Sequence, residues 1–202
     1  MSSTSVIDWA KGAAHAFTEI EQRGISMLPF RHAGITRFQE TGLPTTKDED
    51  WRFTSLKPFI ELPFEIMIES DSQTIDQSAI GDIAFSQHDT DRLVFVDGNI
   101  SSELSQVSEQ SEGVIVSNLA SASPAIENKI GNLSSEDQNP FIALNDAFFT
   151  DGAWIHIPAN STLSKPVHIV FLHTAIKAGQ ASHIRNLIIA ETNAKGTIIE
   201  SH

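Results

Sequence analysis

Residues 42 to 59, GLPTTKDEDWRFTSLKPF, separate two parts of the chain that differ in character. Thr46 and Glu49 have the spacing of a capping box, in which the hydroxyl accepts from an early helix N–H and the carboxylate accepts from the cap residue. The acids at 48 to 50 suit the positive end of a helix dipole. The apolar side chains that follow are Trp51, Phe53 and Leu56. The stretch therefore predicts a short capped helix anchored by Trp51, a structural corner rather than a catalytic site.

Two longer helices are predicted before this corner. Over residues 5 to 22, Ala13, Phe17 and Ile20 recur on one face after a capping Ser5. A second helix is expected from about Pro29, at a first helical position, to Glu40, with Gly42 as the stop. Residues 1–60 are therefore expected to form a helical N-terminal region.

After Pro58 the period changes from that of a helix to that of a strand. Asp97-Gly98-Asn99 is a strong turn signal directly after one of the expected strands. Strands are expected at 61–68, 92–96 and 114–116, and a helix at 117–130. Residues 61–138 are therefore predicted to be a mixed region of strands, loops and one helix.

The last third, residues 139–202, is predicted to open with a helix, PFIALNDAFF, and to continue almost entirely as short strands. These strands are expected at 154–157, 167–173, 187–190 and 197–200. Two of them, VHIVFL and NLIIA, are apolar on both parities and rich in β-branched residues, which favours strands buried in a stacked parallel coil. The final strand would leave an apolar edge uncovered, so we expect this chain to be the N-terminal piece of a longer protein.

Composition restricts the classes of partner. The net charge of −13 and the lack of any Lys/Arg cluster argue against nucleic acid and against a membrane surface. The sequence shows neither a secretory signal nor an apolar run long enough to span a membrane, so a cytoplasmic location is expected. Without cysteine the chain has no disulfide and no thiolate ligand for zinc or an iron–sulfur cluster.

No catalytic, cofactor-binding or metal-ligating residue is assigned. His156, His168, His173 and His183 lie in the strand-rich part, where a cupin-like barrel would place metal ligands. His168 and His173 differ by five residues and should face opposite ways, and no acid stands nearby in the same strand as a third ligand. Nucleotide-binding glycine motifs and a G-x-S-x-G elbow are also missing.

Four stretches, in order, resemble the SufB/SufD family of iron–sulfur cluster assembly scaffolds. They are GLPTTKDEDWRFTSL at 42–56, RLVFVDGNISSELS at 92–105, ALNDAFFTDGAWIHIPANSTLSKPVHIVFL at 143–172 and SHIRNLIIAETNAKGTIIESH at 182–202. The SufD branch is favoured because a helical region precedes the first stretch and cysteine is absent. The resemblance covers both ends of the chain, while the middle, 69–136, is poorly matched.

The resemblance implies an α+β fold: a helical N-terminal region followed by the first rungs of a right-handed parallel β-helix, truncated here. It implies a non-enzymatic scaffold subunit that pairs with a SufB-like subunit, or with a second copy as a homodimer, and binds a SufC-like ATPase. The iron–sulfur cluster and ATP would belong to the complex, with no cofactor bound by this chain. The alternatives are a cupin-like or β-helical enzyme using His156, His168 or His183 on a metal or sugar, and an unrelated β-helical interaction module.

Overall fold

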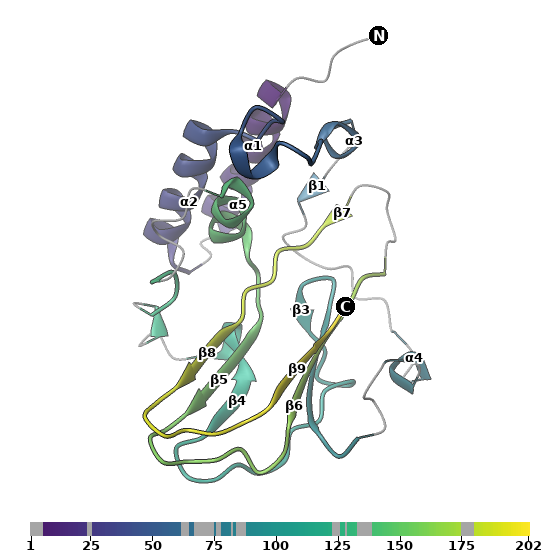
Figure 1. Cartoon of the computed structure of the whole chain (residues 1–202), viewed down its shortest axis with the longest axis vertical. Coiled ribbons are helices and arrows are strands. Elements are labelled where there is room, and N and C mark those ends of the chain that lie inside the picture. Colours follow the sequence, from purple (N-terminus) through teal and green to yellow (C-terminus); the bar gives the residue numbers. More distant parts are fainter. Residues whose placement is uncertain are drawn as a thin grey trace. The chain divides into compact units, whose positions relative to one another are not determined.

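The computed structural model describes residues 6–23, 26–61, 65–66, 75, 78–81, 83, 88–122, 126–127, 129–132, 139–174 and 180–202. The chain divides into two compact units (Figure 1). We call Met1–Ile68, Ala125–Phe149 and Ile176–Ala181 the helical unit, and Glu69–Pro124, Thr150–Ala175 and Ser182–His202 the strand unit. The helical unit contains residues from all three predicted segments, 1–60, 61–138 and 139–202. Those segments follow the order of the sequence, and the division into three remains a prediction.

The core of the helical unit is built by two N-terminal helices and one that comes much later in the chain. These are α1 (Val6–Arg23), α2 (Leu28–Thr41) and α5 (Pro140–Phe148). All three were expected from the sequence, with bounds within two residues. The expected apolar face of α1 is confirmed, since Ala13, Phe17 and Ile20 are buried in the core with Phe38 and Phe148. Among the described helices, none is long and apolar enough to cross a membrane.

The backbones of α2 and α5 approach each other closely at Gly34. A Cβ at that position would lie 2.8 Å from the backbone nitrogen of Ala147 and 2.9 Å from the carbonyl oxygen of Ala143. Only a glycine leaves room for this crossing without moving a helix. The helix that packs against α2 at Gly34 is therefore α5.

The predicted capped helix at 42–59 is wrong. The structure has a 3-10 turn, η1 (Glu49–Trp51), and a separate one-turn helix, α3 (Lys57–Ile60). Pro58 starts the second helix, and within a continuous helix its ring would clash with the preceding turn. The hydrogen-bonded pair that forms here is Thr45 with Asp48, since the Asp48 carboxylate accepts from the backbone N–H of Thr45 at 2.6 Å and from its hydroxyl at 3.0 Å, and the Asp48 side chain does not cap η1.

The strand unit contains two sheets (Figure 1). One has the order β3-β2-β6-β9 and the other the order β4-β5-β8. The strands are β2 (Asp91–Val96), β3 (Asn99–Ile100), β4 (Ile115–Asn118), β5 (Ala153–Ile157), β6 (Val167–Leu172), β8 (Leu187–Ala190) and β9 (Ile198–Ser201). The predicted turn after β2 is confirmed as a tight hairpin, with positive φ at Asp97 and Gly98. Further short elements are the helix α4 (Ser78–Gly81) and, in the helical unit, the strands β1 (Glu65–Ile66) and β7 (Gln180–Ala181), which pair in parallel.

Two consecutive passes of the chain stack in parallel. The first pass is β5 then β6, the second is β8 then β9, and each strand of the second pairs in parallel with its counterpart in the first. β2 also lies parallel beside β6, so its side chains join the same core between the sheets. Buried apolar residues from both sheets fill this core, among them Phe95, Ile155 and Ile169.

The corner between the strands repeats as well. Asn160 and Asn193 both have φ near +60°, and the side-chain amide of Asn193 donates to the side-chain oxygen of Asn160 at 3.2 Å. The two residues are 33 apart, as are the paired residues Trp154 and Leu187 of β5 and β8, whereas paired residues of β6 and β9 are 31 apart. Asparagine tolerates the left-handed conformation better than most residues. The repeat at this corner was not among the expectations from the sequence.

Two sequence expectations in the middle region changed. The helix predicted at 117–130 is wrong over residues 117–122, where β4 runs through Asn118 and a 3-10 turn, η2 (Leu119–Ser121), follows. Residues 123–125 and 128 of that prediction lie outside the described residues. Pairing with β5 determines this outcome, because Ser117 and Asn118 stand opposite Trp154 and Ala153 in the antiparallel ladder. Of the strand predicted at 61–68, Glu65–Ile66 is a strand and Glu61 is a turn, and the remainder lies outside the described residues.

Candidate functional site

Asp151 is the most highly connected buried carboxylate in the described part of the strand unit. One of its oxygens accepts from the backbone N–H groups of Ala120 at 2.9 Å and Gly152 at 2.8 Å. The other accepts from the side-chain amide of Asn118 at 2.8 Å and the N–H of Ile100 at 3.3 Å. Because Asp151 is only 2% exposed, these four donors offset the cost of burying it. The side chain thus ties the β2–β3 hairpin and the end of β4 to the start of β5.

Gly152, the residue after Asp151, determines how closely the two stacked passes approach each other. A Cβ on Gly152 would lie 1.7 Å from the carbonyl oxygen of Arg185. Two backbone bonds hold the passes together there, from Arg185 N–H to the Asp151 carbonyl at 3.0 Å and from Thr150 N–H to the His183 carbonyl at 3.1 Å. The T-D-G sequence at residues 150 to 152 is therefore a buried junction between stacked strands.

A second group of buried charges lies in the helical unit. The Arg31 guanidinium donates to the carbonyls of Ala147 at 3.1 Å and Phe149 at 2.8 Å, at the C-terminal end of α5. A cation there satisfies carbonyls that lack a helical partner and suits the helix dipole. On the same pair of helices, Arg37 forms an ion pair with Asp146, which is fully buried. These contacts hold α5 to α2.

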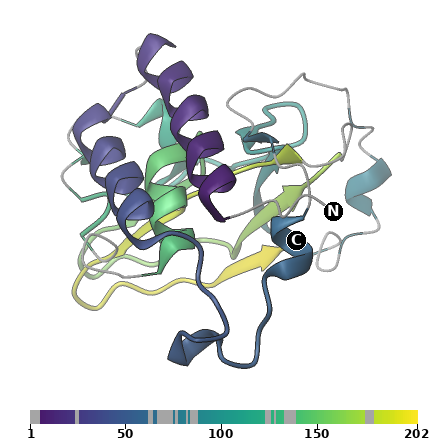
Figure 2. The same cartoon turned by 90° about the horizontal axis from the view of Figure 1, so that it is seen from above.

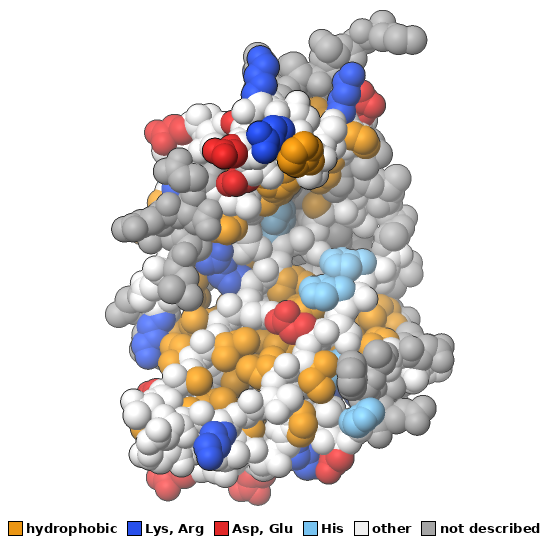
Figure 3. Space-filling view, in the orientation of Figure 1, with side chains coloured by type: hydrophobic (Ala, Val, Ile, Leu, Met, Phe, Trp, Pro, Cys, Tyr) orange, Lys and Arg blue, Asp and Glu red, His pale blue; other side chains and the backbone are white. Residues whose placement is uncertain are grey.

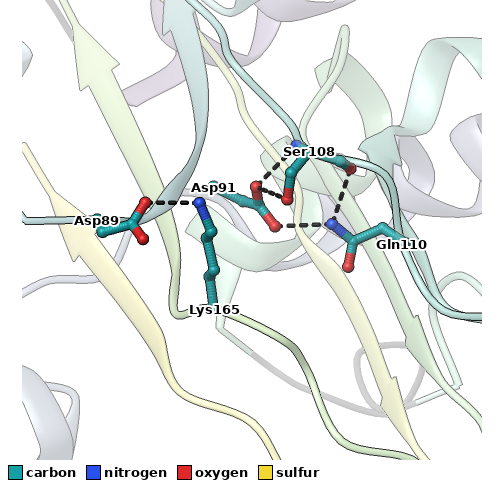
Figure 4. A network of polar contacts seen from close by, with 5 residues as sticks. All are labelled: Asp89, Asp91, Ser108, Gln110 and Lys165. Atoms are coloured by element: carbon teal, nitrogen blue, oxygen red, sulfur yellow. Dashed lines mark hydrogen bonds and ion pairs between the residues drawn. The ribbon is translucent and has the colours of Figure 1, made fainter.

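Asp91 is the centre of a third polar network, at the start of β2 (Figure 4). Its carboxylate accepts from the backbone N–H of Ser108 at 2.8 Å, from the Ser108 hydroxyl at 2.6 Å and from the Gln110 amide at 2.7 Å. Burial tends to raise the pKa of Asp91, but these donors and the nearby Lys165 ammonium hold it below its usual value. Lys165 itself pairs with Asp89 at 2.6 Å, and that contact raises the Lys165 pKa.

The four histidines considered as ligands do not converge. His156 on β5 contacts Glu191 at 2.8 Å, and its ring stacks on that of Trp154. His168 is buried on the side of β6 opposite the core and bonds to Ser201 at 2.9 Å. His173, just after β6, lines a cavity and lies 3.3 Å from the Ser182 hydroxyl. Among the described residues, no group of three or more His, Asp or Glu side chains could hold a metal ion.

The cavity beside His173 has a volume of about 230 Å3. Its lining is mixed, with Phe171 and Ile184 opposite polar side chains that include Glu200 and His202. Glu200 accepts from the Asn186 amide at 2.7 Å, and the His202 ring stacks on Phe171. On the face drawn in Figure 3, hydrophobic side chains gather over the strand unit with acidic and histidine side chains beside them. Among the described lining residues, no carboxylate bonds to the His173 ring, so the Ser182–His173 contact is not completed to a nucleophile–base–acid arrangement.

Two of these histidines are held neutral by their surroundings. Burial lowers the pKa of His168, and the nearby Arg92 guanidinium lowers it further. His183 as a whole residue keeps some solvent exposure, yet burial lowers the pKa of its imidazole to about 4. Both therefore resist protonation near neutral pH, where their neutral rings act as packing and hydrogen-bonding groups.

Comparison with known proteins agrees with the resemblance. The family model described as the SufBD protein N-terminal region matches residues 15–169. An iron–sulfur cluster assembly SufBD family protein of Synechocystis is 28% identical over 163 residues, which are 79% of this chain and 35% of that protein. The iron–sulfur cluster assembly protein SufD of Escherichia coli is 25% identical over 183 residues, which are 89% of this chain and 40% of that protein.

The chain thus spans well under half the length of these relatives. Three of the four stretches on which the resemblance was based lie partly or wholly within the matched range, including the exposed turn at Trp51 and the buried hub at Asp151. The family-model match covers more than half of the chain. The chain belongs to the SufBD family, and it matches that family through its N-terminal region.

Proposed function

We propose that this chain acts in iron–sulfur cluster assembly, as part of a scaffold subunit that pairs with a SufB-like protein and binds a SufC-like ATPase. The match of residues 15–169 to the SufBD N-terminal region carries the proposal, and the names of its relatives in Synechocystis and Escherichia coli agree. In this proposal the cluster and ATP belong to the assembled complex.

The chemistry of the described residues supports a scaffold role. The buried carboxylates Asp91, Asp97 and Asp151 all accept hydrogen bonds that hold loops and strand ends in place. The buried Arg31 caps a helix in the same way. Such groups fix a shape rather than present a reactive atom. We therefore assign the residues of this chain to architecture and to contacts with other proteins.

We also propose that the two stacked passes belong to a right-handed parallel β-helix. The parallel pairing of β5 with β8 and of β6 with β9, and the corner that repeats at Asn160 and Asn193, support this extension. Nearest-neighbour stacking of this kind is how solenoid folds extend.

Affinity purification of the natural protein that carries this chain tests the complex. We expect a SufC-like ATPase and a SufB-like subunit to co-purify in stoichiometric amounts, and depletion of the protein to lower the activity of iron–sulfur enzymes in the cell. If neither partner co-purifies and those enzyme activities stay unchanged, the proposal is wrong.

Metal analysis of the same preparation tests the enzyme alternative separately. Stoichiometric zinc, iron or manganese that is lost in His156→Ala or His183→Ala would favour a metal-dependent enzyme and contradict a purely architectural role. Partner binding that is retained in the same variants would show that they are still folded, so that a loss of metal could be attributed to the missing histidine.

A further inference from the structure

A groove of about 840 Å3 lies along the turn that follows α2 in the helical unit. Its apolar lining consists of Leu43, Pro44, Trp51 and Pro140. The volume falls within the range of roughly 300–1,000 Å3 typical of ligand-binding clefts. In Figure 2 the dark-blue segment between α2 and α3 stands out from the other ribbons of its unit. Leu43, Pro44 and Pro140 are buried and Trp51 is half-buried, so Trp51 is the apolar lining residue that a partner side chain can cover.

The charges that line this groove all have the same sign. They are Asp48, Glu49 and Asp50, and no Lys or Arg belongs to the lining. Asp48 is held by the donors of Thr45, whose backbone N–H is the main reason that the Asp48 pKa is lowered. Glu49 and Asp50 are exposed and form no ion pair with any residue that the structure describes. They remain available to a cation from outside the chain.

An exposed aromatic ring stands beside this groove. Phe53 is 90% exposed and directly precedes Thr54, which lines the groove. The guanidinium of Arg52 lies 4.9 Å from the centre of the Phe53 ring. A single exposed apolar residue needs no explanation, but Phe53 adjoins a lining residue of the groove and is available to a partner that covers the groove. Aromatic residues are enriched in the buried cores of protein interfaces.

We propose that the groove and Phe53 form a docking site for a partner-protein segment that carries lysine or arginine side chains next to apolar ones. The apolar side chains would cover Trp51 and Phe53, and the cations would pair with Glu49 and Asp50. A second copy of this chain fits poorly, because it has 26 acidic against 13 basic residues and the two copies would repel each other. This inference goes beyond cluster assembly, since it concerns a surface that any partner of that chemistry could use.

The nearby cations set a limit on the electrostatic part of the binding. Lys47 and Arg52 flank the acidic residues in sequence, but neither lines the groove. They would oppose a cationic partner, so the attraction comes from the lining acids at short range. Short-range contacts between exposed charges weaken as salt is added. The site should therefore bind more weakly at high ionic strength while keeping an apolar component.

The full chain can be tested with a synthetic amphipathic peptide. The probe is a fluorescein-labelled helical peptide built from leucine and lysine, and its control has glutamate in place of every lysine. Binding is followed by fluorescence anisotropy at low and at near-physiological salt. We expect the lysine peptide to bind, the glutamate peptide not to bind, and the double variant Glu49→Lys with Phe53→Ala to weaken binding at least tenfold. Both substituted residues are exposed, so unchanged urea unfolding is expected to confirm that the variant is folded.

A matched variant separates the groove from the general acidity of the chain. Glu103→Lys makes the same change of charge at an exposed acid in the strand unit, and we expect it to alter binding less than twofold. The proposal is overturned if the two variants weaken binding equally, if the glutamate peptide binds as well, or if the lysine peptide does not bind. It is also overturned if the chain forms a dimer that Phe53→Ala disperses, because a second copy would then be the occupant.

Discussion

Gly152→Ala provides the sharpest test of the stacked passes. The added Cβ would lie 1.7 Å from the Arg185 carbonyl oxygen and 2.4 Å from its carbonyl carbon. These are backbone atoms, so no side chain can rotate out of the way, and the passes must separate by more than about 1 Å. That movement stretches the bond from Arg185 N–H to the Asp151 carbonyl and the bond from Thr150 N–H to the His183 carbonyl.

The expected cost follows from these two effects. Overpacking of a tight contact costs about 1–3 kcal/mol, and each weakened backbone hydrogen bond adds about 1 kcal/mol. We therefore expect Gly152→Ala to lower the free energy of unfolding by about 3–5 kcal/mol, which corresponds to a fall in Tm of roughly 6–20 °C for a chain of this size. Urea unfolding followed by circular dichroism measures the first quantity and a thermal scan the second.

A glycine-to-alanine substitution in α1 should instead raise the stability of the protein. A Cβ on Gly12 meets no atom within 4 Å, and the residue lies inside a helix. Gly12→Ala is therefore expected to stabilise the protein by about 0.5–1 kcal/mol. If Gly152→Ala changed stability by less than 1 kcal/mol, the close approach of the two passes at this residue would be refuted.

Three substitutions should separate buried from exposed side chains, and a change of pH should test His183. Arg31→Met is expected to cost about 2–4 kcal/mol in urea unfolding, because the carbonyls at the end of α5 lose their donor. Trp51→Ala should cost about 1–3 kcal/mol, less than a fully buried tryptophan, since the ring is half-buried against Phe141; Phe53→Ala should cost almost nothing. Unfolding at two pH values should show that stability falls by about 1 kcal/mol between pH 6.5 and 5.5 through His183.

The sign of the pH effect follows from where the proton binds. With a folded pKa of about 4 and an unfolded pKa near 6.5, His183 takes up its proton first in the unfolded chain. Its contribution to stability is complete above pH 6.5 and is lost as the pH falls towards 4. His183→Gln should flatten this slope, and an unchanged slope would contradict the assignment. For the three substitutions, the packing described would be contradicted if Arg31→Met lowered the free energy of unfolding by less than about 1 kcal/mol. It would also be contradicted if Trp51→Ala and Phe53→Ala lowered it equally.

Local patterns predicted most of the regular elements. α5 could be predicted because Asn139 and Pro140 give a start signal, and the Asn139 side chain does accept from the N–H of Phe141 at 2.9 Å. The β2–β3 hairpin could be predicted because Asp97 and Gly98 tolerate positive φ. In both cases the signal lies within a few residues of the element that it determines.

Other features could not be predicted because they depend on partners distant in sequence. The helix expected at 117–130 has suitable spacing, but Asn118 and Ala120 bond to Asp151, more than thirty residues further on. Arg31 gives no sign in the sequence that its partners are carbonyls at the end of α5. One long-range signal does lie in the sequence: the asparagines at 160 and 193 are 33 residues apart, which is the spacing at which β5 pairs with β8.

The two most identifiable motifs of the chain differ in physical character, and this difference bears on function. In T-D-G, the carboxylate of Asp151 and the missing side chain of Gly152 are both accounted for by contacts within the strand unit. In D-E-D-W-R-F, Asp48 and Trp51 have contacts within the helical unit, whereas Glu49, Asp50 and Phe53 project into solvent. A single exposed phenylalanine is normal at a protein surface, but here it adjoins a groove that is lined by exposed acids. Binding would account for this arrangement, so this turn is where we expect the chain to meet another protein.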